Sequence, residues 1–134
     1  MAGYSGTPLV QKLGIKEDHR VAILAGPAGF ELGTLPTGAT VQTSLAGKAP
    51  LDVVIQFATK RAVFETQLAK IRKRMAPACG VWIAWPKAAS KVPTEVTEHV
   101  VREVALPTGL VDNKVCAIDA TWSGLRLVIR RALR

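Results

Sequence analysis

Uninterrupted runs of apolar residues recur along the chain and predict strands that are buried on both faces. The three strongest runs are RVAILA (20–25), LDVVIQFA (51–58) and CGVWIAW (79–85). A weaker segment predicts a further strand at 40–44, and a longer one predicts a strand at 110–118. The last segment, 125–130, alternates between apolar and polar or smaller residues, which is typical of an edge or half-exposed strand.

Apolar residues at helical spacing predict helices between these strands. An amphipathic helix is expected at 60–76, and its apolar positions are Phe64, Leu68, Ile71 and Met75. Thr94 is expected to cap a second helix, whose apolar face would be Val96, Val100 and Val104. Near the N-terminus, Pro8 and Gly14 are placed to start and stop a short helix, with Thr7 as its cap.

This order of elements predicts an α/β fold in a single domain over residues 1–134, with 1–18 as an N-terminal segment. Strands separated by helices favour a small, mainly parallel, Rossmann-like sheet with helices on both faces. A last strand that arrives through a short turn must run antiparallel to its predecessor, as a C-terminal hairpin. The topology resembles a reduced Rossmann-like methyltransferase, an analogy that bears on fold rather than on function.

The charge of the chain favours anionic partners. Eighteen Lys and Arg residues against ten Asp and Glu give a net charge of +8. Part of the excess positive charge lies in 60–74 and part at the C-terminus. Each of these basic segments could be either a solvated surface or a site of phosphate contact. No helix-turn-helix, zinc-finger spacing or aromatic strip accompanies it, so nucleic-acid binding would be unspecific. The cysteines Cys79 and Cys116 form no metal motif and are expected to be buried thiols.

Four motifs in order, GYSGTPL (3–9), PAGF (27–30), WPK (85–87) and TWSGLR (121–126), resemble a domain-of-unknown-function family found mainly in actinobacteria. The resemblance covers nearly the whole chain. It implies a small cytosolic protein and brings no established activity. A cytoplasmic location also agrees with the sequence, which shows no apolar run of membrane-spanning length and no signal-peptide pattern.

Ligands of open α/β sheets bind beyond the carboxyl ends of the strands. Here we expect a crevice that accepts an anion or a nucleotide. Its candidate residues follow the predicted strands: Gly26, Gly29, Phe30, Lys60, Trp85, Lys87, Asp119, Thr121 and Trp122. The glycines would let backbone approach a ligand, the lysines would meet an anion, and a tryptophan would stack on a ring. Tyr4, in the glycine-rich start, is a candidate contact to this crevice or to another chain.

The cofactor is unknown from the sequence, and S-adenosylmethionine is not favoured. A methyltransferase should carry a GxGxG-like turn after its first strand and an acidic residue at the end of its second. This chain has AGPAGF and Thr43-Ser44 instead. Pro27 lacks a backbone donor, and no carboxylate is placed to bind ribose. The same absences weaken an NAD site.

Catalytic groups and metal ligands are not evident either. His19 and His99 have no sequence-evident nucleophile partner and are expected at the surface. Asp119 is placed either as a catalytic carboxylate or as a turn former, whereas Asp52 should lie at the opposite end of the sheet.

The leading hypothesis is therefore a non-catalytic binding or regulatory module. The alternatives are a divergent S-adenosylmethionine-dependent methyltransferase-like enzyme, and nucleic-acid or acidic-protein binding through the basic helix at 60–74. No membrane partner is expected, and the oligomeric state stays open.

Overall fold

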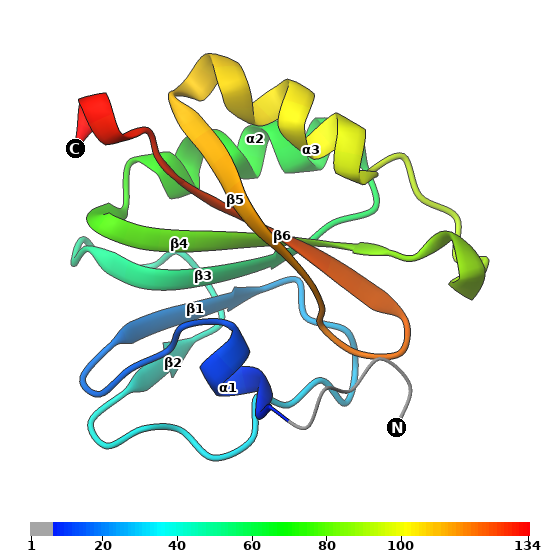
Figure 1. The fold of residues 1–134 in the computed structure, drawn as a ribbon. Coiled ribbons are helices and arrows are strands. Elements are labelled where there is room, and N and C mark those ends of the chain that lie inside the picture. The colour runs from blue at the N-terminus through cyan, green and yellow to red at the C-terminus, as the bar shows by residue number, and fades with distance from the viewer. Residues whose placement is uncertain (1–6) are drawn as a thin grey trace.

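The computed structural model describes residues 7–134, which form a six-stranded sheet with helices on both faces (Figure 1). The strands are β1 (Arg20–Leu24), β2 (Thr40–Gln42), β3 (Leu51–Phe57), β4 (Met75–Pro86), β5 (Leu110–Ala117) and β6 (Trp122–Ile129). The helices are α1 (Leu9–Lys12), α2 (Arg61–Arg72) and α3 (Glu98–Ala105), with short 3₁₀ turns η1 (Ala88–Ser90), η2 (Leu106–Thr108) and η3 (Arg131–Leu133). Within residues 7–134, no helix has the length and apolar character needed to cross a membrane.

The strand order is β2-β1-β3-β4-β6-β5. β1 to β4 are mutually parallel, and β6 runs antiparallel to both of its neighbours. The predicted α/β class, the mainly parallel sheet and the C-terminal antiparallel hairpin are therefore confirmed.

The prediction that the last strand is an edge or half-exposed strand was wrong. β6 lies inside the sheet between β4 and β5, and β5 forms the edge. Leu125, Leu127 and Ile129 are all buried. The alternating pattern arises because one polar residue of the strand, Arg126, lies across Gly80 of β4, where the missing side chain leaves room for a guanidinium group.

Two hydrophobic layers cover the two faces of the sheet. α2 and α3 lie together on one face (Figure 1), where Phe64, Leu68 and Val101 pack into a core that includes Trp85. α1 and the loop after β1 cover the other face, where Trp82 is fully buried. The two tryptophans therefore point to opposite faces, as their spacing of three along a strand predicts.

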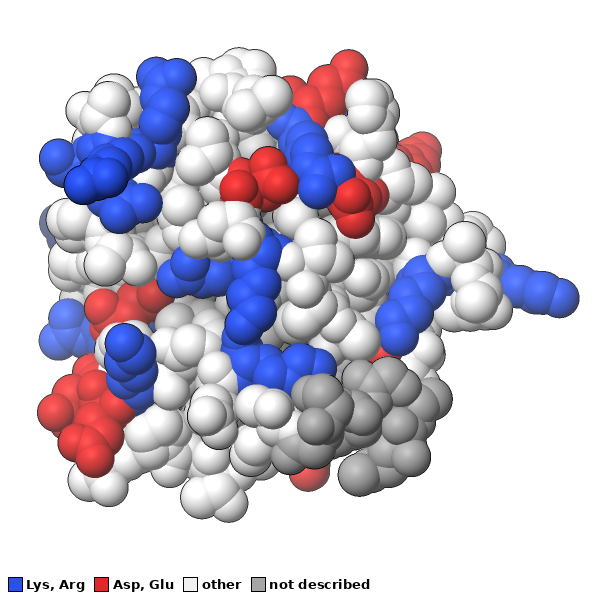
Figure 2. Space-filling model, viewed as in Figure 1, with Lys and Arg blue, Asp and Glu red and all other residues white. Residues whose placement is uncertain are grey.

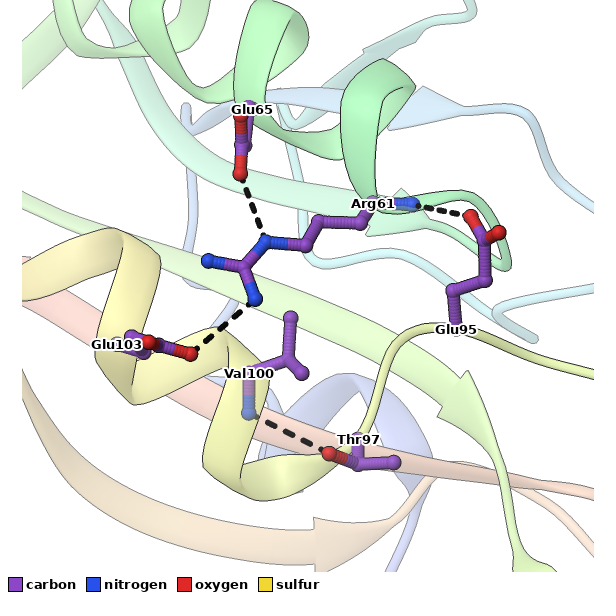
Figure 3. A network of polar contacts seen from close by, with 6 residues as sticks. All are labelled: Arg61, Glu65, Glu95, Thr97, Val100 and Glu103. Carbon is purple, nitrogen blue, oxygen red and sulfur yellow. Dashed lines mark hydrogen bonds and ion pairs between the residues drawn. The ribbon is translucent and has the colours of Figure 1, made fainter.

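Helix α3 begins three residues later than the sequence predicts. Its cap is Thr97, whose Oγ1 accepts a hydrogen bond from Val100 N at 3.3 Å (Figure 3). Thr94 instead bonds both backbone groups of Val96 and holds the turn before the helix. The buried positions of α3 are accordingly Val101 and Ala105. Helix α2 likewise ends at Arg72 rather than at 76, because Met75 already belongs to β4.

The connection between β1 and β2 contains no helix, although the two strands are parallel. Its apolar residues Phe30, Leu32, Leu35 and Ala39 pack against the same core as α1. The loop thus takes the place of a crossover helix and leaves its own backbone at the carboxyl end of β1.

The two thiols differ in burial, and this predicts a difference in reactivity. Cys79 is fully buried, and burial raises the pKa of its thiol to about 12. Cys116 is half-buried, and burial raises the pKa of its thiol too, while the nearby Lys12 and Lys114 lower it. Because the thiolate is the reactive form, we expect Ellman's reagent to titrate Cys116 first in the native protein and Cys79 after unfolding. Equal rates for both thiols would contradict this.

The raised pKa of Cys79 makes the stability of the protein depend on pH. An unfolded cysteine ionises near about 8.5, well below the folded value at Cys79. The unfolded state therefore loses its proton first, and the stability contributed by the buried thiol is present below that pH and lost as the pH rises toward 12. In urea unfolding, a Cys79→Ala variant should show a smaller loss of stability between pH 8 and 10 than the wild-type protein.

Candidate functional site

A cavity of about 250 Å³ opens beyond the carboxyl end of β1. It is lined by Ile23, Ala25, Gly26, Pro27, Phe30 and Thr43, which come from β1, from the loop after it and from the end of β2. This is the edge of a parallel sheet at which ligands of α/β proteins bind. Two of the predicted site residues, Gly26 and Phe30, therefore line a cavity at the predicted place.

The loop beside this cavity has an unusual backbone. Ala25 has a φ of 55°, in the left-handed region that residues with a side chain seldom adopt. Gly29 has a φ of 81° in a turn in which Phe30 N donates to Pro27 O at 3.1 Å. The N–H groups of Gly26, Ala28 and Gly29 donate to no backbone carbonyl of the described chain. At the mouth of the cavity, the loop thus presents three N–H groups that have no backbone acceptor within residues 7–134.

A larger cavity of about 500 Å³ adjoins the first and shares Ile23 with it. Its walls combine apolar side chains with one carboxylate: Ile23, Glu31, Leu32, Gly33, Thr34, Leu35 and Val41. Sequence reasoning missed these residues. The signal available was the segment FELG after PAGF, where one acidic residue stands among apolar ones.

Aromatic rings fill the space between the ends of β1 and β3. Phe57 contacts Phe30 and Trp122 edge to face, with ring centroids 4.9 and 5.0 Å apart. Phe57 is buried, and the other two rings are partly buried. These contacts bring together the loop after β1 and the start of β6, two segments that the sequence predicted would meet. Of the three rings, Phe30 also lines the cavity beyond β1.

Lys87, Asp119 and Thr121 form a separate hydrogen-bonded group at the start of the β6 hairpin. Lys87 Nζ donates to Asp119 O at 2.8 Å, and Lys87 N donates to Thr121 O at the same distance. The carboxylate Oδ1 of Asp119 accepts from Thr121 N and from Trp122 N, both at 2.8 Å. Asp119 is therefore a turn former here, and the ammonium of Lys87 is used inside the fold.

The other candidates lie elsewhere. Trp85 is 8% exposed and belongs to the core under α2 and α3. Lys60 is exposed at the N-cap position of α2. Asp52 lies at the opposite end of the sheet, as expected, where its Oδ2 accepts from Arg20 N at 2.8 Å. Tyr4 is outside the described residues.

Solved structures of methyltransferases share this arrangement of elements. A S-adenosylmethionine-dependent methyltransferase from Aquifex aeolicus aligns with a TM-score of 0.60 at 15% identity, covering 90% of this chain and 87% of that one. DhpI, solved in complex with S-adenosylhomocysteine, aligns with a TM-score of 0.64 at 12% identity, covering 92% and 83%. The fold is that of the Rossmann-like methyltransferases.

The magnesium protoporphyrin IX methyltransferase of Synechocystis, solved with bound S-adenosylmethionine, has the same fold with a TM-score of 0.58 at 11% identity. The alignment covers 90% of this chain and 74% of the Synechocystis chain. No family model matches the sequence, and no curated protein matches it. The resemblance to a domain-of-unknown-function family therefore stays a prediction.

Proposed function

We propose that this chain is a divergent methyltransferase-like protein that binds an S-adenosyl ligand in the two adjoining cavities beside β1 and β2. The cavity beyond the carboxyl end of β1, in a sheet of this fold, carries the proposal. Two proteins of the same fold were solved with S-adenosylhomocysteine or S-adenosylmethionine bound. S-adenosylmethionine supplies, when bound, an activated methyl group on a sulfonium centre.

The lining residues fit the parts of such a ligand. The apolar wall of Leu32, Leu35 and Val41 suits an adenine ring. The free N–H groups of the loop at 26–29 suit the carboxylate of the amino-acid end. For the ribose hydroxyls, the Thr43 hydroxyl and the Glu31 carboxylate offer acceptors from two sides. Glu31 would thus supply the acid that the sequence lacks at the end of its second strand.

A thermal-shift titration with S-adenosylhomocysteine tests this proposal, with free adenosine for comparison. A ligand at about 100 times its Kd adds about 2.7 kcal/mol, which should raise the Tm by several degrees. Glu31→Gln should weaken binding about tenfold, because one acceptor for the ribose loses its charge. Glu17→Gln, the same charge change at an exposed residue outside these cavities, should bind like the wild-type protein. No shift at millimolar ligand would refute the proposal.

A second candidate function is the non-catalytic module, and the hydrogen bonds around Asp119 favour it. Its carboxylate and the ammonium of Lys87 are both engaged inside the fold, and neither cavity beside β1 is lined by a histidine. Incubation of the protein and a cell extract with methyl-labelled S-adenosylmethionine separates the two functions. Label transferred to an acceptor supports the enzyme. Ligand binding without transfer supports the module.

Nucleic-acid or acidic-protein binding through 60–74 stays a prediction. In the structure, contacts within the chain engage some of the basic side chains of this segment and leave fewer for a partner. Arg61 is engaged by Glu65 and Glu103, at 2.8 and 3.2 Å (Figure 3). Arg74 donates to carbonyls of the loop before β3, among them Ala49 O at 2.8 Å. Phosphate contact would then depend mainly on Lys60, Lys70 and Lys73, which form no ion pair with a residue that the structure describes.

A further inference from the structure

A second polar hollow, of about 320 Å³, lies at the other end of the sheet, beside the amino-terminal half of β3. It is lined by residues from five separate segments: Gln11, Lys12, Leu13, Gly14, Lys16, Asp52, Val53, Ala78, Asn113, Lys114 and Arg126. Four of these carry a positive charge, and we call Lys12, Lys16, Lys114 and Arg126 the basic cluster. Figure 2 shows basic side chains running down the middle of this face, from the crossing of β5 and β6 toward α1.

Arg126 is a partly buried member of the basic cluster. Its guanidinium lies on Gly80, where a Cβ would come 2.8 Å from Nη2 and 2.9 Å from Cζ. Arg126 is partly buried, and this burial lowers the pKa of its guanidinium from the usual value. No hydrogen bond or ion pair joins this side chain to a described residue. Residues 1–6 contain no Asp or Glu and add no carboxylate.

Hydrogen bonds to backbone carbonyl groups orient the side chains of two lysines of the cluster, Lys12 and Lys114. Lys12 Nζ donates to Ala117 O at 3.0 Å, and Lys114 Nζ donates to Lys12 O at 3.4 Å. A bulge in β5 between Asp112 and Lys114 lets the adjacent residues Asn113 and Lys114 line the same hollow. In a regular strand their side chains would point to opposite faces.

The negative charge beside the cluster does not balance it. Asp52 is the one carboxylate among the described lining residues, and its Oδ2 accepts from Arg20 N. A partly buried guanidinium without an acceptor costs free energy of desolvation. A bound anion would relieve this cost.

We propose that this hollow binds a small ligand that carries a diphosphate or an equivalent pair of adjacent phosphate charges. Arg126 offers a planar set of donors that matches phosphate oxygens, and Lys12, Lys16 and Lys114 add positive charge around it. The volume lies at the low end of small-molecule pockets, which suits a compact anion. The cations converge on a concave surface, whereas nucleic acid is bound along an extended track. This site is separate from the cavities beside β1 and does not depend on the proposed function.

Titration calorimetry of the full chain with inorganic pyrophosphate tests the proposal. The wild-type protein should bind it saturably. Arg126→Gln should weaken binding at least tenfold, since a charge-assisted hydrogen bond is lost. Gly80→Ala keeps every charge and displaces the guanidinium, so it should weaken binding as well. Lys70→Gln, which removes one positive charge from the exposed side of α2, should bind within about twofold of the wild-type protein.

Three results would overturn the proposal. The first is an absence of saturable pyrophosphate binding at millimolar concentration. The second is an equal loss of affinity in Arg126→Gln and Lys70→Gln, because binding would then follow net charge rather than the hollow. The third concerns a single-stranded oligonucleotide used as a second probe: if Arg126→Gln weakens its binding and leaves that of pyrophosphate unchanged, the phosphates belong to nucleic acid. Thermal unfolding of each free variant shows that it is folded.

Discussion

Replacing Trp82 by alanine is expected to lower the free energy of unfolding by about 3–5 kcal/mol, among the largest effects of any single substitution in this chain. The side chain is fully buried in the layer under α1. Its indole Nε1 donates to Leu13 O at 3.1 Å and so ties the segment after α1 to β4. The variant therefore loses the packing of a large ring and leaves a buried carbonyl without its donor. Urea unfolding followed by circular dichroism measures the change.

Two control variants separate these contributions. Trp82→Phe keeps a ring in the core and removes the indole donor, so its loss should be about 1–3 kcal/mol. Val63→Ala truncates an apolar side chain that is 56% exposed on α2, and its effect should stay within about 0.5 kcal/mol. If Trp82→Ala were no more destabilising than Val63→Ala, the packing described for this face of the sheet would be wrong.

Introducing a charge at position 56 should lower the free energy of unfolding by an amount comparable to that expected for Trp82→Ala. Gln56 is 1% exposed at the end of β3, where its Nε2 donates to Phe57 O at 2.8 Å and its Oε1 accepts from Gln67 Nε2 at 3.2 Å. A glutamate here would place a carboxylate without a cation in a buried position and would lose the donor to Phe57 O. We expect Gln56→Glu to destabilise the protein by about 3 kcal/mol at pH 8.

The loss in Gln56→Glu should depend on pH in one direction. Burial raises the pKa of a glutamate in the folded state above its unfolded value of about 4.3. The folded state then retains a proton that the unfolded state has lost, so the variant becomes less stable relative to wild type as the pH rises above about 4.3. The slope is about 1.4 kcal/mol per pH unit until the folded pKa is reached. Gln56→Met, which carries no charge, should show a pH-independent loss. The same flat profile for Gln56→Glu would refute the prediction.

The sequence predicted the elements of the fold better than their places in it. Apolar runs such as VWIAW identify buried strands because both faces of a parallel sheet exclude water. The alternating pattern of the last strand led to a wrong prediction of its position. Such a pattern shows which side chains are polar, but it does not show whether the strand lies at the edge of the sheet or inside it. Arg126 is polar and half-buried, since Gly80 on the neighbouring strand makes room for it.

The cap of α3 was misplaced for a related reason. Thr94 and Thr97 are both threonines followed by an acidic residue, and local chemistry does not distinguish them. Tertiary packing does, because Val96 must reach the core before the helix can begin.

The candidate site was predicted in part. Gly26 and Phe30 belong to a loop directly after a strand, so topology alone places them at the carboxyl edge. Glu31 and Val41 were missed because nothing local in the sequence shows how the connection between β1 and β2 folds back over the sheet. The basic cluster was missed since its members are far apart along the chain and meet through tertiary structure.

The position of β6 has a consequence for how the chain is made. β5 pairs with β6, and β4 also pairs with β6, so neither pairing can form until β6 has been synthesised. A nascent chain that has emerged only as far as the β5–β6 turn carries unsatisfied strand edges on β5 and on β4, which lies inside the complete sheet. Translation proceeds at about 5–20 residues per second, so this period lasts for about a second or more. The central sheet should therefore be completed only after β6 has emerged, and until then the free edges of β4 and β5 are exposed to chaperones and to aggregation.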